Sequence, residues 1–94
     1  MDKELLSLFE RLIEMHKQAV VTYAPYADDI IKGYITSERE IERVLDGMLD
    51  HCGYEDMLVL FKKVLRSIFY KHPRLVYDYV YIYKDLYDTP DEEE

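Results

Sequence analysis

The chain has 94 residues, of which 49% are hydrophobic and 34% charged, and its formal net charge is −8. This length allows one small domain, the apolar content excludes disorder of the whole chain, and the scarcity of Gly and Pro excludes a turn-rich β-sandwich. A single cysteine, Cys52, excludes a disulfide framework and predicts a reducing, cytoplasmic setting. The longest apolar run, residues 57–61, is too short for a membrane span, and the first residues do not resemble an export signal.

The first predicted element is a long amphipathic helix over residues 2–23. Its apolar-face residues recur at steps of three and four, which places them together at about 100° per residue. They are Leu5, Leu8, Phe9, Leu12, His16, Ala19, Val20 and Tyr23. Because Pro25 has no amide hydrogen, we expect the helix to stop or kink at Ala24. A short second helix is expected over 26–32, with Gly33 at its end.

The next helix start is marked by Ser37 and Glu40, which match a capping box. The apolar stripe that follows consists of Ile41, Val44, Leu45, Met48, Leu49 and Cys52. Gly53 is expected to cap the end of this helix. A fourth helix is expected over 55–71, and its inward residues are Met57, Phe61, Val64, Leu65, Ile68 and Phe69.

Pro73 is placed as a first-turn proline and begins a fifth helix that reaches about Tyr87. Tyrosines alternate with period two in this segment, which is typical of a strand, but no second segment could pair with it. The sequence therefore predicts an all-α fold, a compact bundle of four or five helices with mostly antiparallel neighbours. We expect residues 1–88 to form a single helical domain and residues 89–94 an acidic disordered tail.

Motifs that carry chemistry are missing from this chain. With Gly only at 33, 47 and 53, neither a dinucleotide fingerprint nor a phosphate-binding loop can form. His51 and Cys52 are adjacent and point about 100° apart on a helix, which leaves too few ligands for a closed metal site. His16 lies on an apolar face and is expected to be a hydrogen-bonded core or boundary residue. We predict no catalytic residue, no metal site and no cofactor, and therefore no enzyme.

Residues 57–77 carry five basic groups and no acidic one, and these are Lys62, Lys63, Arg66, Lys71 and Arg74. Helical spacing places the first three on the outer side of their helix, with Tyr70 beside them. Three interpretations stay open: ion pairs within the chain, docking on an acidic face of a second copy or partner protein, and phosphate contact with Tyr70 stacked on a base. The acidic remainder of the chain disfavours nucleic acid as the partner.

An acidic face complements this basic one. It consists of Glu38, Glu42, Asp46 and Asp50, which are spaced by four residues. Such a like-charge stripe destabilises an isolated helix, so nearby cations would relieve it. Regularly spaced negative charge would also suit a protein that imitates nucleic acid and blocks a DNA-processing or defence enzyme.

Tyrosine is the other unusual feature, with ten in the chain and six of them in residues 70–87. If the fifth helix buries Tyr79 and Tyr83, then Tyr77 and Tyr81 lie on its outer face. Tyrosine is enriched at interfaces because it supplies apolar area at low rotamer cost. Tyr70, Tyr77 and Tyr81 are therefore candidate contact residues, although a tyrosine face could equally pack on the first helix or lie in solvent without a partner.

Three segments of the chain carry a family resemblance: Glu-Ile-Glu-Arg-Val-Leu-Asp-Gly-Met-Leu-Asp-His-Cys (40–52), Leu-Phe-Lys-Lys-Val-Leu-Arg (60–66), and Tyr79-Val80 before Tyr83-Lys84-Asp85. With them, residues 37–88 resemble small uncharacterised proteins of conjugative and other mobile elements in Gram-positive gut bacteria. The resemblance implies a bacterial, cytoplasmic setting and a role in element maintenance. It implies no activity and no functional residues.

Together these patterns predict a non-enzymatic protein–protein interaction module that self-associates. Its predicted contact surfaces are the outer tyrosines and the basic face formed by Lys62, Lys63, Arg66 and Arg74. Two alternatives remain: an acidic mimic of nucleic acid, and nucleic-acid binding through the basic face. No membrane contact is expected.

Overall fold

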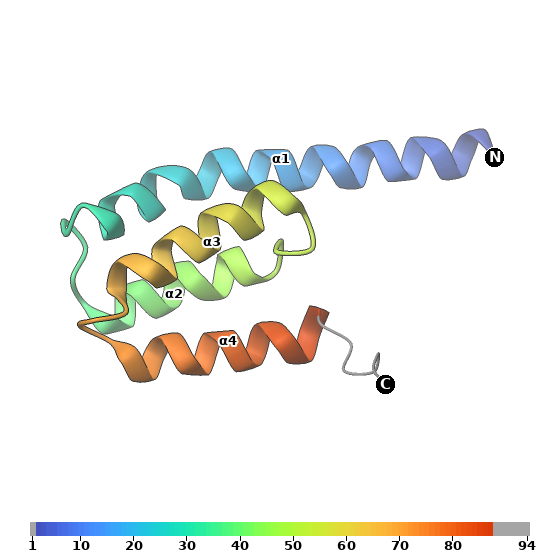
Figure 1. The fold of residues 1–94 in the computed structure, drawn as a ribbon. Coiled ribbons are helices and arrows are strands. Elements are labelled where there is room, and N and C mark those ends of the chain that lie inside the picture. Colours follow the sequence, from blue (N-terminus) through green and yellow to red (C-terminus); the bar gives the residue numbers. More distant parts are fainter. Residues whose placement is uncertain (1, 88–94) are drawn as a thin grey trace.

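The computed structural model describes residues 2–87, which fold into four helices without a strand in this range (Figure 1). The helices are α1 (Lys3–Ile31), α2 (Glu38–Leu49), α3 (Glu55–Ile68) and α4 (Pro73–Tyr87). This confirms the predicted all-α class. The acidic tail expected over 89–94 lies outside the described residues.

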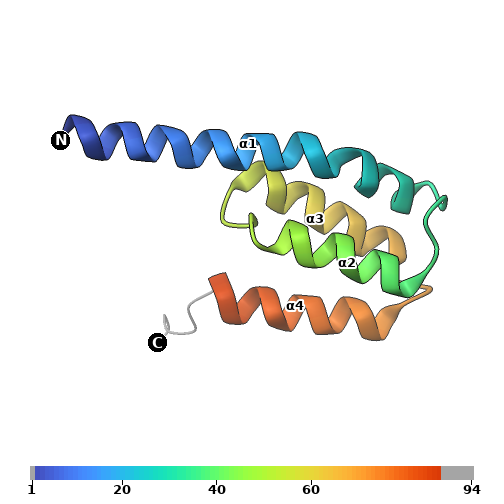
Figure 2. The ribbon, with the colours of Figure 1, turned by 180° about the vertical axis from the view of Figure 1, so that it is seen from behind.

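The four helices form three layers. Each helix runs back against the one before it, as Figures 1 and 2 show from opposite sides. The middle layer is the pair α2 and α3; α1 packs on one side of this pair and α4 on the other, so that within the described residues α1 and α4 do not contact each other. Each outer helix therefore has one face in the core and one face directed away from it.

Local signals in the sequence set three of the helix boundaries. The Ser37 hydroxyl accepts a hydrogen bond from the Glu40 amide at 3.4 Å and caps α2 as predicted. Pro73 is the first residue of α4, where its missing amide hydrogen costs nothing. Gly33 has a φ of +84° just after α1 ends, a left-handed conformation that suits glycine.

Pro25 lies inside α1, and the helix continues through it. The predicted stop was therefore wrong, and the segments 2–23 and 26–32 form one helix, which makes four helices in place of five. Proline removes the hydrogen bond to the carbonyl of Val21, and its ring also crowds that carbonyl. Val21 is 73% exposed, which places this interruption on the side of α1 that faces away from the core.

Two other helix ends differ from the prediction. α2 ends at Leu49, and Gly53 does not adopt the left-handed conformation of a capping glycine. α3 ends at Ile68, before the expected Lys71. Phe69, which was predicted to point inward, follows as the C-cap residue and is 41% exposed.

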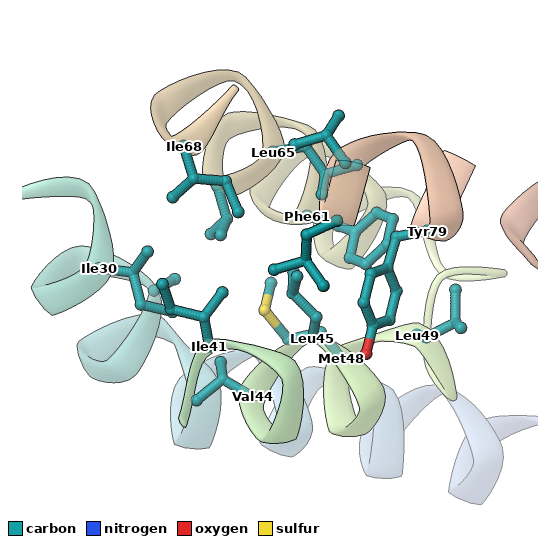
Figure 3. Packing of buried hydrophobic residues seen from close by; sticks show 14 of the residues in the cluster. Ile30, Ile41, Val44, Leu45, Met48, Leu49, Phe61, Leu65, Ile68 and Tyr79 are labelled. Carbon is teal, nitrogen blue, oxygen red and sulfur yellow. The ribbon is translucent and has the colours of Figure 1, made fainter. Parts of the chain in front are cut away.

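The core fills the space between the facing stripes of α2 and α3 (Figure 3). Its largest fully buried side chains are Phe61, Ile41, Leu45, Met48, Met57 and Val64, which confirms the two apolar stripes predicted for these helices. Ala27 and Ile30 enter this core from α1, and Leu75, Val76 and Tyr79 enter it from α4. Within the described residues, no helix is both long enough and apolar enough to cross a bilayer.

Candidate interaction surface

The first thirteen residues of α1, Lys3 to Met15, extend beyond the rest of the bundle (Figures 1 and 2). We call this segment the overhang. All of its residues are exposed, including every large apolar one. The exposed fractions of these apolar residues lie between 41% and 58%, and they are Leu5, Leu6, Leu8, Phe9, Leu12, Ile13 and Met15.

The overhang carries the same apolar face as the covered part of α1. At about 100° per residue, Leu5, Phe9 and Leu12 lie on the helix face that further along buries Ala27 and Ile30. α1 has 29 residues, whereas α2 has 12 and α3 has 14. The two shorter helices therefore cover only the second half of α1, and its first half presents an apolar face without a cover.

A pair of histidines lies where the overhang meets the bundle. The Nδ1 atoms of His16 in α1 and His51 after α2 are 3.0 Å apart, and one ring must donate to the other because both cannot carry a hydrogen there. The ring of Tyr54 stacks on His16, with the centroids 5.6 Å apart. His16 is thus a half-buried, hydrogen-bonded boundary residue, as predicted. The cluster fixes the point at which the overhang leaves the bundle.

Reactive groups are scarce in the described part of the chain. Within it, no three His, Cys, Asp or Glu side chains come together as metal ligands would. Burial raises the pKa of the Cys52 thiol to about 12, so this thiol is protonated and a poor nucleophile at neutral pH. A groove of about 450 Å³ between α1 and α2 has Glu40 and Arg43 as its charged lining residues.

The tyrosines of α4 divide between core and surface. Tyr79 is buried, and its hydroxyl donates to the carbonyl of Glu42 at 3.2 Å and to the carboxylate of Asp46. Burial and the neighbouring Asp46 both raise the pKa of Tyr79. In contrast, Tyr77 and Tyr81 are 58% and 68% exposed on the outer face of α4, away from α1. The structure therefore leaves both available for contact.

The predicted basic face is exposed, but its members point in two directions. Lys62 and Arg66 line a groove between α3 and α4 together with Phe69. Lys63 lines a different groove, between α1 and α3. Tyr70 is 93% exposed beside Phe69, and Lys71 and Arg74 are exposed around the turn that follows. The cations therefore do not form one continuous patch around Tyr70.

The acidic face lies along the side of α2 that approaches α4. Asp46 accepts from Tyr79, and a Glu38 carboxylate oxygen lies 3.9 Å from Nδ1 of His72. Glu42 is half-buried and Asp50 is exposed. Among the described residues, no ion pair joins this face to the cations of α3, so the interpretation that the two charge sets neutralise each other within the chain is wrong there.

The sequence did not predict the overhang, because hydrophobic periodicity shows which side of a helix is apolar but not whether another helix packs against that side. A signal was available in the helix lengths. The predicted first helix exceeded the apolar stripes expected to cover it, and a helix longer than its neighbours must leave one end uncovered. The exposed tyrosines and cations, in contrast, follow directly from helical spacing.

Comparison with known proteins adds no assignment. No family model matches this sequence, and neither curated proteins nor solved structures show significant similarity to it. The molecule is therefore described as a four-helix, all-α fold over its described residues. The resemblance to proteins of mobile elements stays a prediction.

Proposed function

We propose that this protein is a non-enzymatic interaction module that self-associates through the apolar face of the overhang. The observation that carries the proposal is the exposure of seven large apolar side chains on a helix segment that projects from the bundle. Contiguous apolar surface of this kind marks interaction sites in soluble proteins.

Energetics support a covered state of the overhang. Full burial of a Leu or Phe side chain contributes about 1.5–3 kcal/mol, and several such side chains lie together here. A helix of thirteen residues without tertiary packing is also marginal in water, because helices in proteins gain most of their stability from a packed face. A partner that covers this face would remove its apolar side chains from water and would also stabilise the helix.

The overhang supports this role better than the surfaces predicted from the sequence do. Tyr77 and Tyr81 project from α4 with polar hydroxyls and between charged neighbours. The cations of α3 are divided between two grooves. The overhang combines a continuous apolar arc with charges of both signs along one border, Glu4 and Arg11, and such a surface suits a second copy of itself.

Sedimentation of the full chain tests the proposal. We expect a dimer that persists at high salt, since burial of apolar surface does not depend on charge. Leu8→Glu should weaken the dimer at least about 100-fold, because a carboxylate would have to be buried in the contact. Val59→Glu is the matched control: Val59 lies on α3 and is 48% exposed, against 49% for Leu8. A chain that is monomeric at every concentration and salt level would overturn self-association.

A further inference from the structure

An acid and a base border the apolar face of the overhang on one side. At about 100° per residue, Glu4 and Arg11 lie along one edge of this face. They are seven residues apart and form a short row. Within the described part of the chain, neither of these two side chains makes an ion pair.

A two-fold axis brings this row against its own copy in reverse. When two identical helices pack antiparallel around a two-fold axis, each edge of one helix meets the same edge of the other, run in reverse. An axis midway between Ser7 and Leu8 places residue 4 opposite residue 11. The row then pairs acid with base twice, which gives two ion pairs across the contact.

We infer that two copies of this chain pair antiparallel through their overhangs, centred between Ser7 and Leu8, with Glu4 opposite Arg11 of the second copy. The inference rests on the proposed function and specifies its geometry. It also brings Leu5 of each copy to within one residue of Phe9 of the other, so the apolar residues meet in the same register.

The bundle itself excludes the parallel alternative. By helical spacing, the apolar face of the overhang continues into the face of α1 that buries Ala27 and Ile30. α2 and α3 lie against this second half of α1 (Figures 1 and 2). A second α1 lying parallel on that face would run into the first copy's own α2 and α3 beyond His16. In the antiparallel register, the N-cap Asp2 of the second copy reaches only Ile13, so its helix ends before the bundle begins.

Charge reversal with mixing tests the register. In the full chain, Glu4→Arg places two arginines opposite each other twice per dimer, and Arg11→Glu does the same with two glutamates. Each variant alone should dimerise about ten-fold more weakly than the wild type at low salt. An equal mixture of the two variants should recover association to within about two-fold of the wild type, since every opposed pair in the mixed dimer is again acid with base.

A control variant and the wild-type chain distinguish an incorrect register from an absence of self-association. Glu14→Arg makes the same charge change on the outer, polar face of α1 and should leave dimerisation unchanged. A wild-type dimer with no recovery in the mixture would overturn the antiparallel register and leave the proposed function standing. A monomeric wild type would overturn both.

Discussion

The two halves of α1 carry the same apolar face in different surroundings. In the second half, Ala27 and Ile30 are 0% and 4% exposed because α2 and α3 lie against them. In the first half, Leu5 and Phe9 on the same face are 44% and 46% exposed. The difference arises from the lengths of the neighbouring helices and not from the residues of α1. An apolar stripe therefore indicates which side of a helix packs against other residues. It does not indicate which element packs there, because that depends on the lengths and positions of the neighbouring helices.

The largest expected difference in stability is between a Phe→Ala substitution in the core and the same substitution in the overhang. Phe61→Ala should lower the free energy of unfolding by about 3–5 kcal/mol, because Phe61 is 1% exposed at the centre of the core. Phe9→Ala should change it by less than about 0.5 kcal/mol in dilute, monomeric protein, since no part of the described bundle covers Phe9. Urea unfolding at two protein concentrations measures both. Equal losses in dilute protein would show that the overhang packs on its own bundle.

Contact between the covered half of α1 and α2 can be broken at Gly47. A Gly→Ala change inside a helix usually stabilises by about 0.5–1 kcal/mol. At this position, however, the added Cβ would collide with the ring of Tyr23 from α1. Gly47→Ala should therefore destabilise by about 1–3 kcal/mol.

A double-mutant cycle, measured by urea unfolding, tests whether the loss of stability in Gly47→Ala comes from the collision with the Tyr23 ring. In a Tyr23→Ala background the collision disappears, and Gly47→Ala should become neutral or stabilising. If Gly47→Ala stabilises the wild-type chain instead, then α1 and α2 are not in close contact at this point.

The covered region should also respond to alkali through Cys52. Burial raises the pKa of this thiol from an ordinary 9.0 to about 12, so between these values the unfolded chain loses a proton that the folded chain keeps. The stability that this group contributes is complete below about pH 9 and declines as the pH rises towards 12. Cys52→Ala should be less stable than the wild type at about pH 8, and the difference should shrink at about pH 11. A constant difference in urea unfolding would mean that the thiol is solvated.

The smallest effect is expected at the exposed tyrosines of α4. Tyr77→Ala combined with Tyr81→Ala should change the free energy of unfolding by less than about 0.5 kcal/mol per site, because both rings are exposed. Sedimentation of this double variant should match that of the wild type, since the contact is assigned to α1. Loss of the dimer here, with Leu8→Glu unaffected, would move the interface to α4.

Much of this fold follows from local signals in the sequence. Ser37, Pro73 and Gly33 mark helix boundaries through capping, a missing amide hydrogen and a left-handed φ, each of which depends on one or two neighbouring residues. The buried stripes of α2 and α3 follow from helical periodicity. The outward position of Tyr77 follows in the same way once the helix is recognised.

What the sequence did not predict depends on tertiary surroundings. Pro25 lies inside α1 on the side that faces away from the core, and the local proline signal does not reveal that the helix continues through it. Phe69 fits the spacing of the α3 stripe, yet it lies at the C-cap of the helix and is 41% exposed. The hydrogen bond from Tyr79 to Asp46 joins residues 33 apart in the chain, so it is specified only by the packing of α4 on α2.

The state of the overhang can be observed directly by hydrogen exchange. An uncovered thirteen-residue helix should open often, whereas the same helix packed against a second copy should exchange slowly. We therefore predict that the amides of residues 6–15 become protected as protein concentration rises, while those of Leu45 and Phe61 are protected throughout. Rapid exchange over residues 6–15 at every concentration, with the core still protected, would contradict the claim that a second copy covers the overhang.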